Sequence, residues 1–148
     1  MVNDLDNMIS NLRVSMIVEC RILILDDDII TLTFMKNILN KIGVTNIETA
    51  GNGKQGLAIL EKSLPDLLLC DLGMPEMDGV ELLQELSQKG FKGGVILISG
   101  LHAEMLSGME LLARKLGLNI LGILPKPVAS DQLFPMLVDF CCQPGKRL

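Results

Sequence analysis

Short apolar runs alternate, between residues 21 and 124, with longer segments in which apolar residues recur at helical spacing. The runs 21–25, 66–70 and 95–99 are apolar at all but one position, as expected of strands that are buried on both faces of a sheet. In the intervening segments Leu, Ile and Met stand three or four residues apart, which predicts amphipathic helices. This alternation is typical of an α/β protein with a parallel sheet.

The pattern predicts five strands and five helices in this region. The expected strands are residues 21–25, 46–49, 66–70, 95–99 and 120–124, and the expected helices are residues 31–42, 54–61, 78 or 79–88, 103–116 and 131–140. Gly43 ends the first of these helices, Asn52 and Gly53 form a turn, and Ser130 or Asp131 caps the last helix. Because crossovers are right-handed, a doubly wound sheet of order 2-1-3-4-5, with helices on both faces, is the simplest arrangement.

The two ends of the chain differ from this pattern. Residues 1–19 are predicted to be an N-terminal extension, either a helix that packs on the domain or on a partner, or a loose arm. Residues 20–142 are expected to form one domain and residues 143–148 a linker stub. A chain of 148 residues leaves little room for a second folded domain.

Composition and charge narrow the range of partners. Aromatic residues make up only 3% of the chain and the net charge is −5, which argues against direct binding of nucleic acid. No apolar run approaches the roughly 20 residues that span a bilayer. Cys20, Cys70, Cys141 and Cys142 lack C-x-x-C spacing and no signal peptide opens the chain, so we expect a cytoplasmic protein with reduced thiols.

Residues with chemical capability follow four of the five expected strands. Asp26, Asp27 and Asp28 follow the first strand, and the others are Asp71, Ser99 and Lys126. Taken alone, the Asp run fits a helix N-cap, and residues 74–79 and 99–100 fit a turn and a loop. However, the carboxyl ends of parallel strands share one edge, with neighbouring strands about 4.8 Å apart. The order of these residues therefore favours a single site.

The expected site combines several carboxylates with one lysine and one hydroxyl. Neighbouring carboxylates raise one another's pKa unless a cation binds them, and oxygen ligands favour Mg²⁺ or Mn²⁺. Beside such an ion one carboxylate can attack a phosphoryl donor, while the Lys126 ammonium neutralises charge on the transferred group and Ser99 donates a hydrogen bond to it. The sequence thus predicts a phosphoryl-accepting site.

These residues resemble the receiver domain of two-component response regulators, over about residues 20–142. The resemblance rests on ILILDDD at residues 22–28, DLGMPEMDG at residues 71–79, Ser99 with Gly100, and Lys126 between two prolines. It implies a flavodoxin-like fold and a signalling switch without independent enzymatic turnover. It also implies a phosphoryl donor, either a sensor histidine kinase or a phosphotransfer protein.

The resemblance also implies a role for each matching residue. Asp26 and Asp27 would form the acidic pair, with Asp27 the direct Mg²⁺ ligand, and Asp71 would take the phosphoryl group and bind the metal. Gly73 would offer its backbone carbonyl to the metal. Ser99 would be the switch hydroxyl, and Lys126, followed by a cis peptide, would contact the phosphoryl group. The face formed by the fourth helix, the fifth strand and the fifth helix would then bind an output domain, a partner protein or a dimer mate.

Three departures from the family pattern are visible. Ile123 stands three residues before Lys126, where the family usually has an aromatic switch residue. Gly73 and Leu101 replace polar residues that influence hydrolysis, which predicts slow autodephosphorylation. The segment from Ser99 to Lys126 is longer than usual, and residues 108–128 resemble receivers that precede EAL-type cyclic-di-GMP phosphodiesterase domains. On that resemblance the chain would be a portion of a longer regulator.

Two alternatives remain open at this point. A phosphatase of the haloacid dehalogenase type also uses an Asp nucleophile and Mg²⁺, but its D-x-D motif is absent at residues 71–73. A degenerate receiver that serves only for docking or dimerisation fits the replacement at Ile123.

Overall fold

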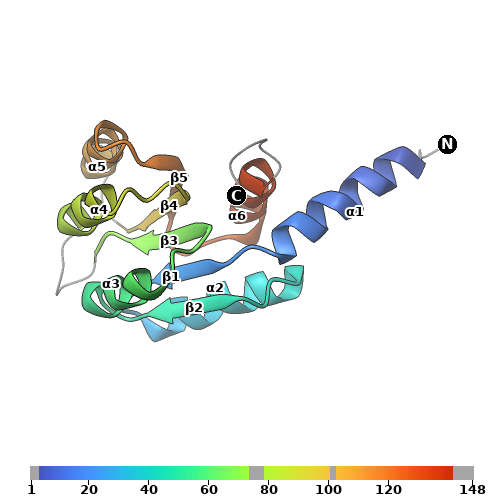
Figure 1. Ribbon diagram of the computed structural model, residues 1–148, viewed down its shortest axis with the longest axis horizontal. Coiled ribbons are helices and arrows are strands. Elements are labelled where there is room, and N and C mark those ends of the chain that lie inside the picture. Colours follow the sequence, from blue (N-terminus) through green and yellow to red (C-terminus); the bar gives the residue numbers. More distant parts are fainter. Residues whose placement is uncertain (1–3, 74–78, 101–102, 142–148) are drawn as a thin grey trace.

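The computed structural model describes residues 4–73, 79–100 and 103–141. Five parallel strands form one sheet in the order β2-β1-β3-β4-β5 (Figure 1). The strands are β1 (Ile22–Leu25), β2 (Ile47–Ala50), β3 (Leu67–Asp71), β4 (Gly94–Ser99) and β5 (Asn119–Pro125). The helices are α1 (Asp4–Val18), α2 (Ile29–Ile42), α3 (Gly53–Lys62), α4 (Gly79–Gln88), α5 (Ala103–Lys115) and α6 (Ser130–Cys141). The predicted fold class and strand order are confirmed.

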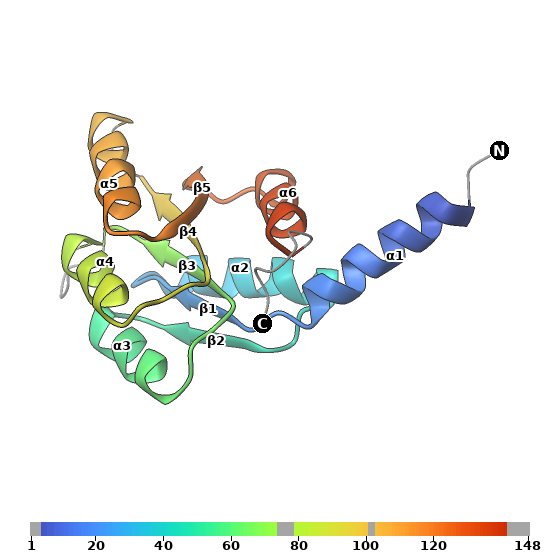
Figure 2. The same ribbon diagram turned by 45° about the horizontal axis from the view of Figure 1, so that its top comes forward.

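Two hydrophobic clusters lie on opposite faces of the sheet. Successive residues of a strand point to opposite faces, so Ile24 and Leu69 belong to one cluster while Leu25 and Cys70 belong to the other. The first cluster includes residues of α2 and α6, and the second includes residues of α3, α4 and α5, as the placement of these helices in Figure 2 shows. The central strands are therefore covered on both sides, which explains their apolar sequences.

Local hydrogen bonds fix where the helices begin and end. The side chain of Asp28 accepts a hydrogen bond from the backbone N–H of Ile30 (3.1 Å), so α2 begins two residues earlier than the periodicity predicts. Asn52 caps α3 in the same way, and Gly53 is its first residue rather than part of a free turn. Gly43 ends α2 with a φ of 109°, as its position after the helix predicts.

The N-terminal segment is helical and projects from the sheet layers (Figures 1 and 2). Its last turn contacts the domain, where Ile17 is fully buried and α1 packs against α6. Just after α1, the Sγ atoms of Cys20 and Cys141 lie 3.0 Å apart, so the segment between α1 and β1 meets the end of α6. The expected linker at residues 143–148 and Cys142 lie outside the described residues. Within the described part of the chain, none of the helices has the length and apolarity to cross a membrane.

Candidate functional site

Asp26 is a buried carboxylate at the end of β1. Its backbone N–H donates to the carbonyl of Ala50 on β2 (3.1 Å), which continues the sheet pairing to this residue. Its Oδ1 accepts a hydrogen bond from the backbone N–H of Asp28 (2.8 Å). The carboxylate is therefore held between a strand end and the start of α2, with no solvent exposure.

Asp71 ends the neighbouring strand β3 and is also buried. Strand pairing sets Leu25 beside Cys70, so Asp26 and Asp71 are the next residues along the two strands. The Asp71 Oδ1 accepts a hydrogen bond from the backbone N–H of Gly73 (3.0 Å), which turns the chain at the strand end. Two carboxylates thus occupy adjacent positions on the edge where the sequence predicts them.

Lys126 directly follows β5, and its side chain contacts both carboxylates. Its Nζ lies 3.0 Å from Asp26 Oδ2 and 3.1 Å from Asp71 Oδ2. Its backbone N–H donates to the carbonyl of Ser99 (3.2 Å), so the end of β4 positions the lysine. The Lys126-Pro127 peptide is cis, as the resemblance implies. The lysine therefore supplies one positive charge between two buried acids.

Burial and charge act against one another in this site. Burial raises the pKa of Asp26 above its usual value, although the Asp28 N–H and the Lys126 ammonium both stabilise its charged form. Burial alone would lower the pKa of Lys126, but its contacts with Asp26 and Asp71 raise it. Asp26 Oδ2 has this close ammonium neighbour but no hydrogen bond of regular geometry within the described residues. A buried carboxylate oxygen that lacks a regular hydrogen bond is stabilised by a further cation.

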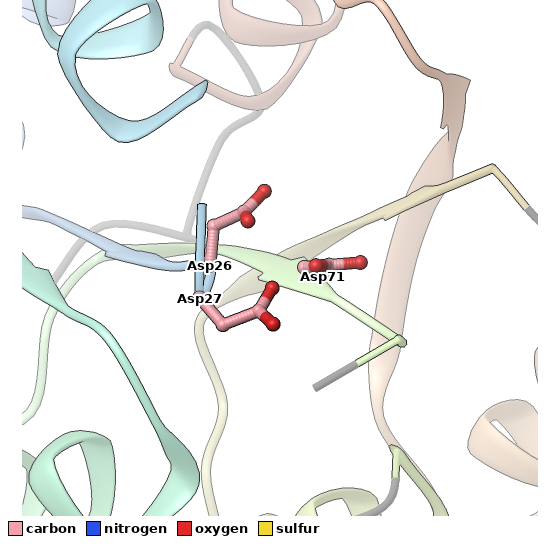
Figure 3. Close-up of side chains that lie close together, drawn as sticks. All are labelled: Asp26, Asp27 and Asp71. Carbon is pink, nitrogen blue, oxygen red and sulfur yellow. The ribbon is translucent and has the colours of Figure 1, made fainter. Parts of the chain in front are cut away.

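Asp27 completes a group of three carboxylates (Figure 3). Oxygen atoms of Asp26, Asp27 and Asp71 all lie within 4.8 Å of one another, and Asp27 is exposed to solvent. An all-oxygen group that is open on one side suits a hard divalent ion that keeps some water ligands. The residues therefore fit Mg²⁺ or Mn²⁺, in line with the sequence prediction.

The three consecutive aspartates have three different environments. Asp28 accepts hydrogen bonds from the backbone of Ile30 and from the Thr31 hydroxyl (2.8 Å), and these two contacts lower its pKa. It is the N-cap of α2 and stands outside the carboxylate group. The Asp run thus contains both a helix N-cap, Asp28, and members of the candidate metal site, Asp26 and Asp27.

The remaining predicted residues occupy the same edge or lie outside the described part. Ser99 is buried at the end of β4. Gly73 follows Asp71 by two positions and is exposed. Ile123 lies on β5 and packs against the second core cluster. Residues 74–78 and Leu101 are not among the described residues. Sequence reasoning did not predict that Lys126 contacts both acids or that the backbone N–H of Asp28 donates to Asp26.

Comparisons with known proteins agree with this arrangement. A family model for the response regulator receiver domain matches residues 22–138. A protein-glutamate methylesterase/protein-glutamine glutaminase of Treponema denticola is 33% identical over 118 residues, which cover 76% of this chain and 30% of that protein. The crystal structure of a response regulator from Colwellia psychrerythraea is 33% identical, with a TM-score of 0.70 over 82% of this chain and 96% of that one. A CheY-like receiver domain protein from Methanospirillum hungatei JF-1 gives a TM-score of 0.72 at 28% identity, over 82% of this chain and 93% of that one.

The matched region is one module of larger proteins in several of these relatives. The chain spans 30% of the methylesterase and 35% of the regulator of RpoS from Escherichia coli. What the remaining parts of those proteins do is therefore not carried over to this chain. The match to the receiver model also decides against the haloacid dehalogenase alternative.

Proposed function

Since the chain belongs to the family of response regulator receiver domains, we propose that it is a phosphorylation-controlled switch in which Asp71 accepts a phosphoryl group. The donor would be a sensor histidine kinase or a phosphotransfer protein. The observation that supports this proposal best is the placement of Lys126 Nζ within 3.1 Å of Asp71, beside a group of three carboxylates. Receiver domains are generally switches rather than enzymes with independent turnover.

The proposed metal ligands are carboxylates of Asp26, Asp27 and Asp71 together with the backbone carbonyl of Gly73. Three of these groups already lie within 4.8 Å of one another. A bound Mg²⁺ supplies positive charge that offsets the negative charge of the incoming phosphoryl oxygens. Mn²⁺ would serve through the same oxygen ligands.

In the proposed transfer, a carboxylate oxygen of Asp71 attacks the phosphorus of the donor. A bond between oxygen and phosphorus forms, and the bond from phosphorus to the donor nitrogen or oxygen breaks, with the leaving group keeping the electron pair. Lys126 would then exchange its contact with the Asp71 carboxylate for one with a phosphoryl oxygen. Ser99 would donate its hydroxyl hydrogen bond to another phosphoryl oxygen.

The proposed readout is the face formed by α5, β5 and α6, which follow Ser99 and Lys126 in the chain. Movement of Ser99 and Lys126 toward the phosphoryl group would change the affinity of this face for an output domain, a partner or a dimer mate. Because Ile123 replaces the usual aromatic residue, the signal would have to pass through backbone shifts of β4 and β5. The similarity of residues 108–128 to receivers of EAL-type regulators makes a cyclic-di-GMP phosphodiesterase domain one candidate output.

The proposal is tested by incubating the chain with acetyl phosphate and Mg²⁺ and measuring the intact mass. We expect a gain of one phosphoryl group, which is lost without Mg²⁺ and in Asp71→Ala. Asp28→Ser is the matched control, because it changes the adjacent acid that caps α2 and keeps a good capping residue. It should leave labelling intact.

Size-exclusion elution with beryllofluoride and Mg²⁺ then tests the switch. An elution change in the native chain that is absent in Asp71→Ala would support a phosphorylation-dependent surface. Absence of labelling in the folded native chain, with the Asp28→Ser variant equally unlabelled, would overturn the proposal in favour of a docking module.

A further inference from the structure

Two buried cysteines face each other where the N-terminal segment meets the last helix. Cys20 lies between α1 and β1, and Cys141 is the last residue of α6. Both residues are fully buried, and their Sγ atoms lie 3.0 Å apart without a disulfide between them. They belong to one core cluster, which also contains Ile17 and Phe140. The fold therefore holds in contact two thiols that are 121 positions apart in the chain.

The third described cysteine, Cys70, has a different environment. It lies on β3 and belongs to the core cluster on the opposite face of the sheet. Its Sγ lies 3.7 Å from the backbone carbonyl of Asp71, and burial raises the pKa of its thiol well above the usual value. A thiol that stays protonated is a poor nucleophile, and the sheet separates Cys70 from the other two sulfurs. Cys70 is therefore expected to be inert.

We propose that Cys20 and Cys141 form a reversible disulfide when the protein meets a hydroperoxide, and that this bond fastens α6 to the segment before β1. To form the bond, the two sulfur atoms have to approach by about 1 Å, to the usual S–S length of about 2.05 Å. The proposal goes beyond phosphoryl transfer, because neither cysteine belongs to the carboxylate group.

The oxidation takes two steps, in which the thiols lose two electrons and the peroxide gains them. First, the Cys141 sulfur attacks one oxygen of hydrogen peroxide, the O–O bond breaks, and a sulfenic acid forms while the thiol proton leaves in a molecule of water. Next, the Cys20 sulfur attacks the sulfenic sulfur, the S–O bond breaks, and the hydroxide leaves with the Cys20 proton as a second water. A dithiol reductant reverses the reaction by exchange with the disulfide.

Burial slows the first step, whereas proximity speeds the second. Cys141 stands in the last described turn of α6, and helix ends open more readily than helix centres. Hydrogen peroxide is small enough to reach the thiol during such openings. Once the sulfenic acid has formed, Cys20 is already beside it, so the reaction within the molecule is faster than reaction with a thiol from solution. The pair should therefore oxidise slowly and give one main product.

The disulfide would close a loop that contains the whole sheet. All five strands lie between residues 20 and 141. A bond that closes so long a loop restricts the unfolded chain, so the oxidised protein should unfold at a higher temperature. The bond would also restrict α6, which belongs to the proposed readout face. That second consequence rests on the proposed function, whereas the disulfide itself does not.

Peptide mapping of the 148-residue chain after treatment with hydrogen peroxide, without Mg²⁺ or phosphodonor, tests the bond. Trypsin digestion without reductant should give a cross-link between peptide 14–21, which contains Cys20, and peptide 116–146, which contains Cys141. The second peptide also contains Cys142, so Cys142→Ala is the matched control. It should keep the cross-link, whereas Cys141→Ala should lose it. Absence of the cross-link in the folded native chain, or its persistence in Cys141→Ala, would overturn the proposal.

Thermal unfolding of the native chain gives a second measurement that needs no variant. The oxidised chain should melt at least about 5 °C higher than the same sample after treatment with a dithiol. A dithiol reduces the disulfide but leaves oxidised methionines as they are, so the comparison isolates the bond. Oxidised Cys142→Ala should show the same rise. Equal melting temperatures before and after reduction, in a chain that carries the mapped cross-link, would contradict the fastening of α6.

Discussion

The carboxyl edge of the sheet and the N-terminal helix are held in place in very different ways. At the edge, Asp26, Asp71 and Lys126 come from three strands and are fixed by strand pairing, backbone hydrogen bonds and ion pairs. Along α1, burial of Ile17 anchors the last turn on the domain, whereas Leu5 and Leu12 are largely exposed. The sheet therefore positions its site by contacts within the domain, whereas the burial of α1 is concentrated in its last turn.

This difference has a direct consequence for mutations. A residue at the sheet edge is surrounded by groups that depend on it, so its replacement should change stability or chemistry in the isolated chain. Replacement of an exposed side chain in the first three turns of α1 should leave the free energy of unfolding nearly unchanged. Four sets of substitutions test how each region depends on its contacts, from the largest expected effect to the smallest.

The largest stability effect is expected for Ile17→Ala. Ile17 is fully buried in the first core cluster, and loss of a buried isoleucine side chain leaves a cavity, so the free energy of unfolding should fall by about 3 kcal/mol. Leu12→Ala on the same helix should change it by less than about 0.5 kcal/mol at concentrations where the chain is monomeric. Urea denaturation of both variants measures the contrast. Equal effects would show that α1 packs as one unit.

The next largest effect is expected for Lys126→Met. It removes the ammonium beside Asp26 and Asp71, which leaves two buried carboxylates without a counter-charge, and the cost should be about 2 kcal/mol in EDTA because the lysine is partly exposed. Mg²⁺ should then stabilise the variant more than the native chain, as thermal unfolding can measure. Lys41→Met, at an exposed lysine, is the control. A Mg²⁺-independent melting temperature in Lys126→Met would contradict the metal assignment.

A pair of glycines in helices tests how closely the layers pack. A Cβ on Gly56 of α3 would overlap the side chain of Leu25 on β1, so Gly56→Ala should lower the free energy of unfolding by about 1 kcal/mol. A Cβ on Gly108 of α5 would meet no atom within 4 Å, and Gly108→Ala should raise it by about 0.5–1 kcal/mol through helix propensity. Chemical denaturation would detect the opposite signs. A stabilised Gly56→Ala would mean that α3 can move away from the sheet.

The smallest effect is kinetic and concerns Gly73. A Cβ at this position would meet Asp71 Oδ1 at an ordinary contact distance of 3.5 Å, so a polar side chain fits there. Gly73→Asn should therefore shorten the lifetime of the phosphorylated chain several-fold by orienting water, without changing stability. Loss of the phosphoryl mass over time measures both chains. A half-life of seconds in the native chain would contradict the predicted slow hydrolysis.

Much of the fold follows from the sequence because the apolar patterns are strong. The central strands read as continuous apolar runs since they are covered on both faces, and the right-handed crossovers then restrict the strand order. The site follows from the same reasoning. Asp71 and Lys126 lie far apart in the sequence, but each follows a strand of one parallel sheet, and the structure places their side chains 3.1 Å apart.

The errors and omissions come from features that local sequence does not encode. Asn52 and Gly53 have the composition of a turn, and only the hydrogen bond from Gln55 to Asn52 shows that a helix begins there. The separate roles of Asp26, Asp27 and Asp28 depend on strand pairing and burial. The sequence pattern could not decide between a packed helix and a loose arm for residues 1–19. Their apolar positions fall on two sides of the helix, and only one side meets the domain.

The contact between Cys20 and Cys141 also bears on when the protein can fold during synthesis. It joins a residue two positions before β1 to the last described turn, 121 positions later, within a core cluster that contains Ile17 and Phe140 as well. A nascent chain cannot complete this cluster until α6 has left the ribosome. We therefore expect that the N-terminal strands stay open to chaperones until α6 has emerged, and that the domain then closes in one step.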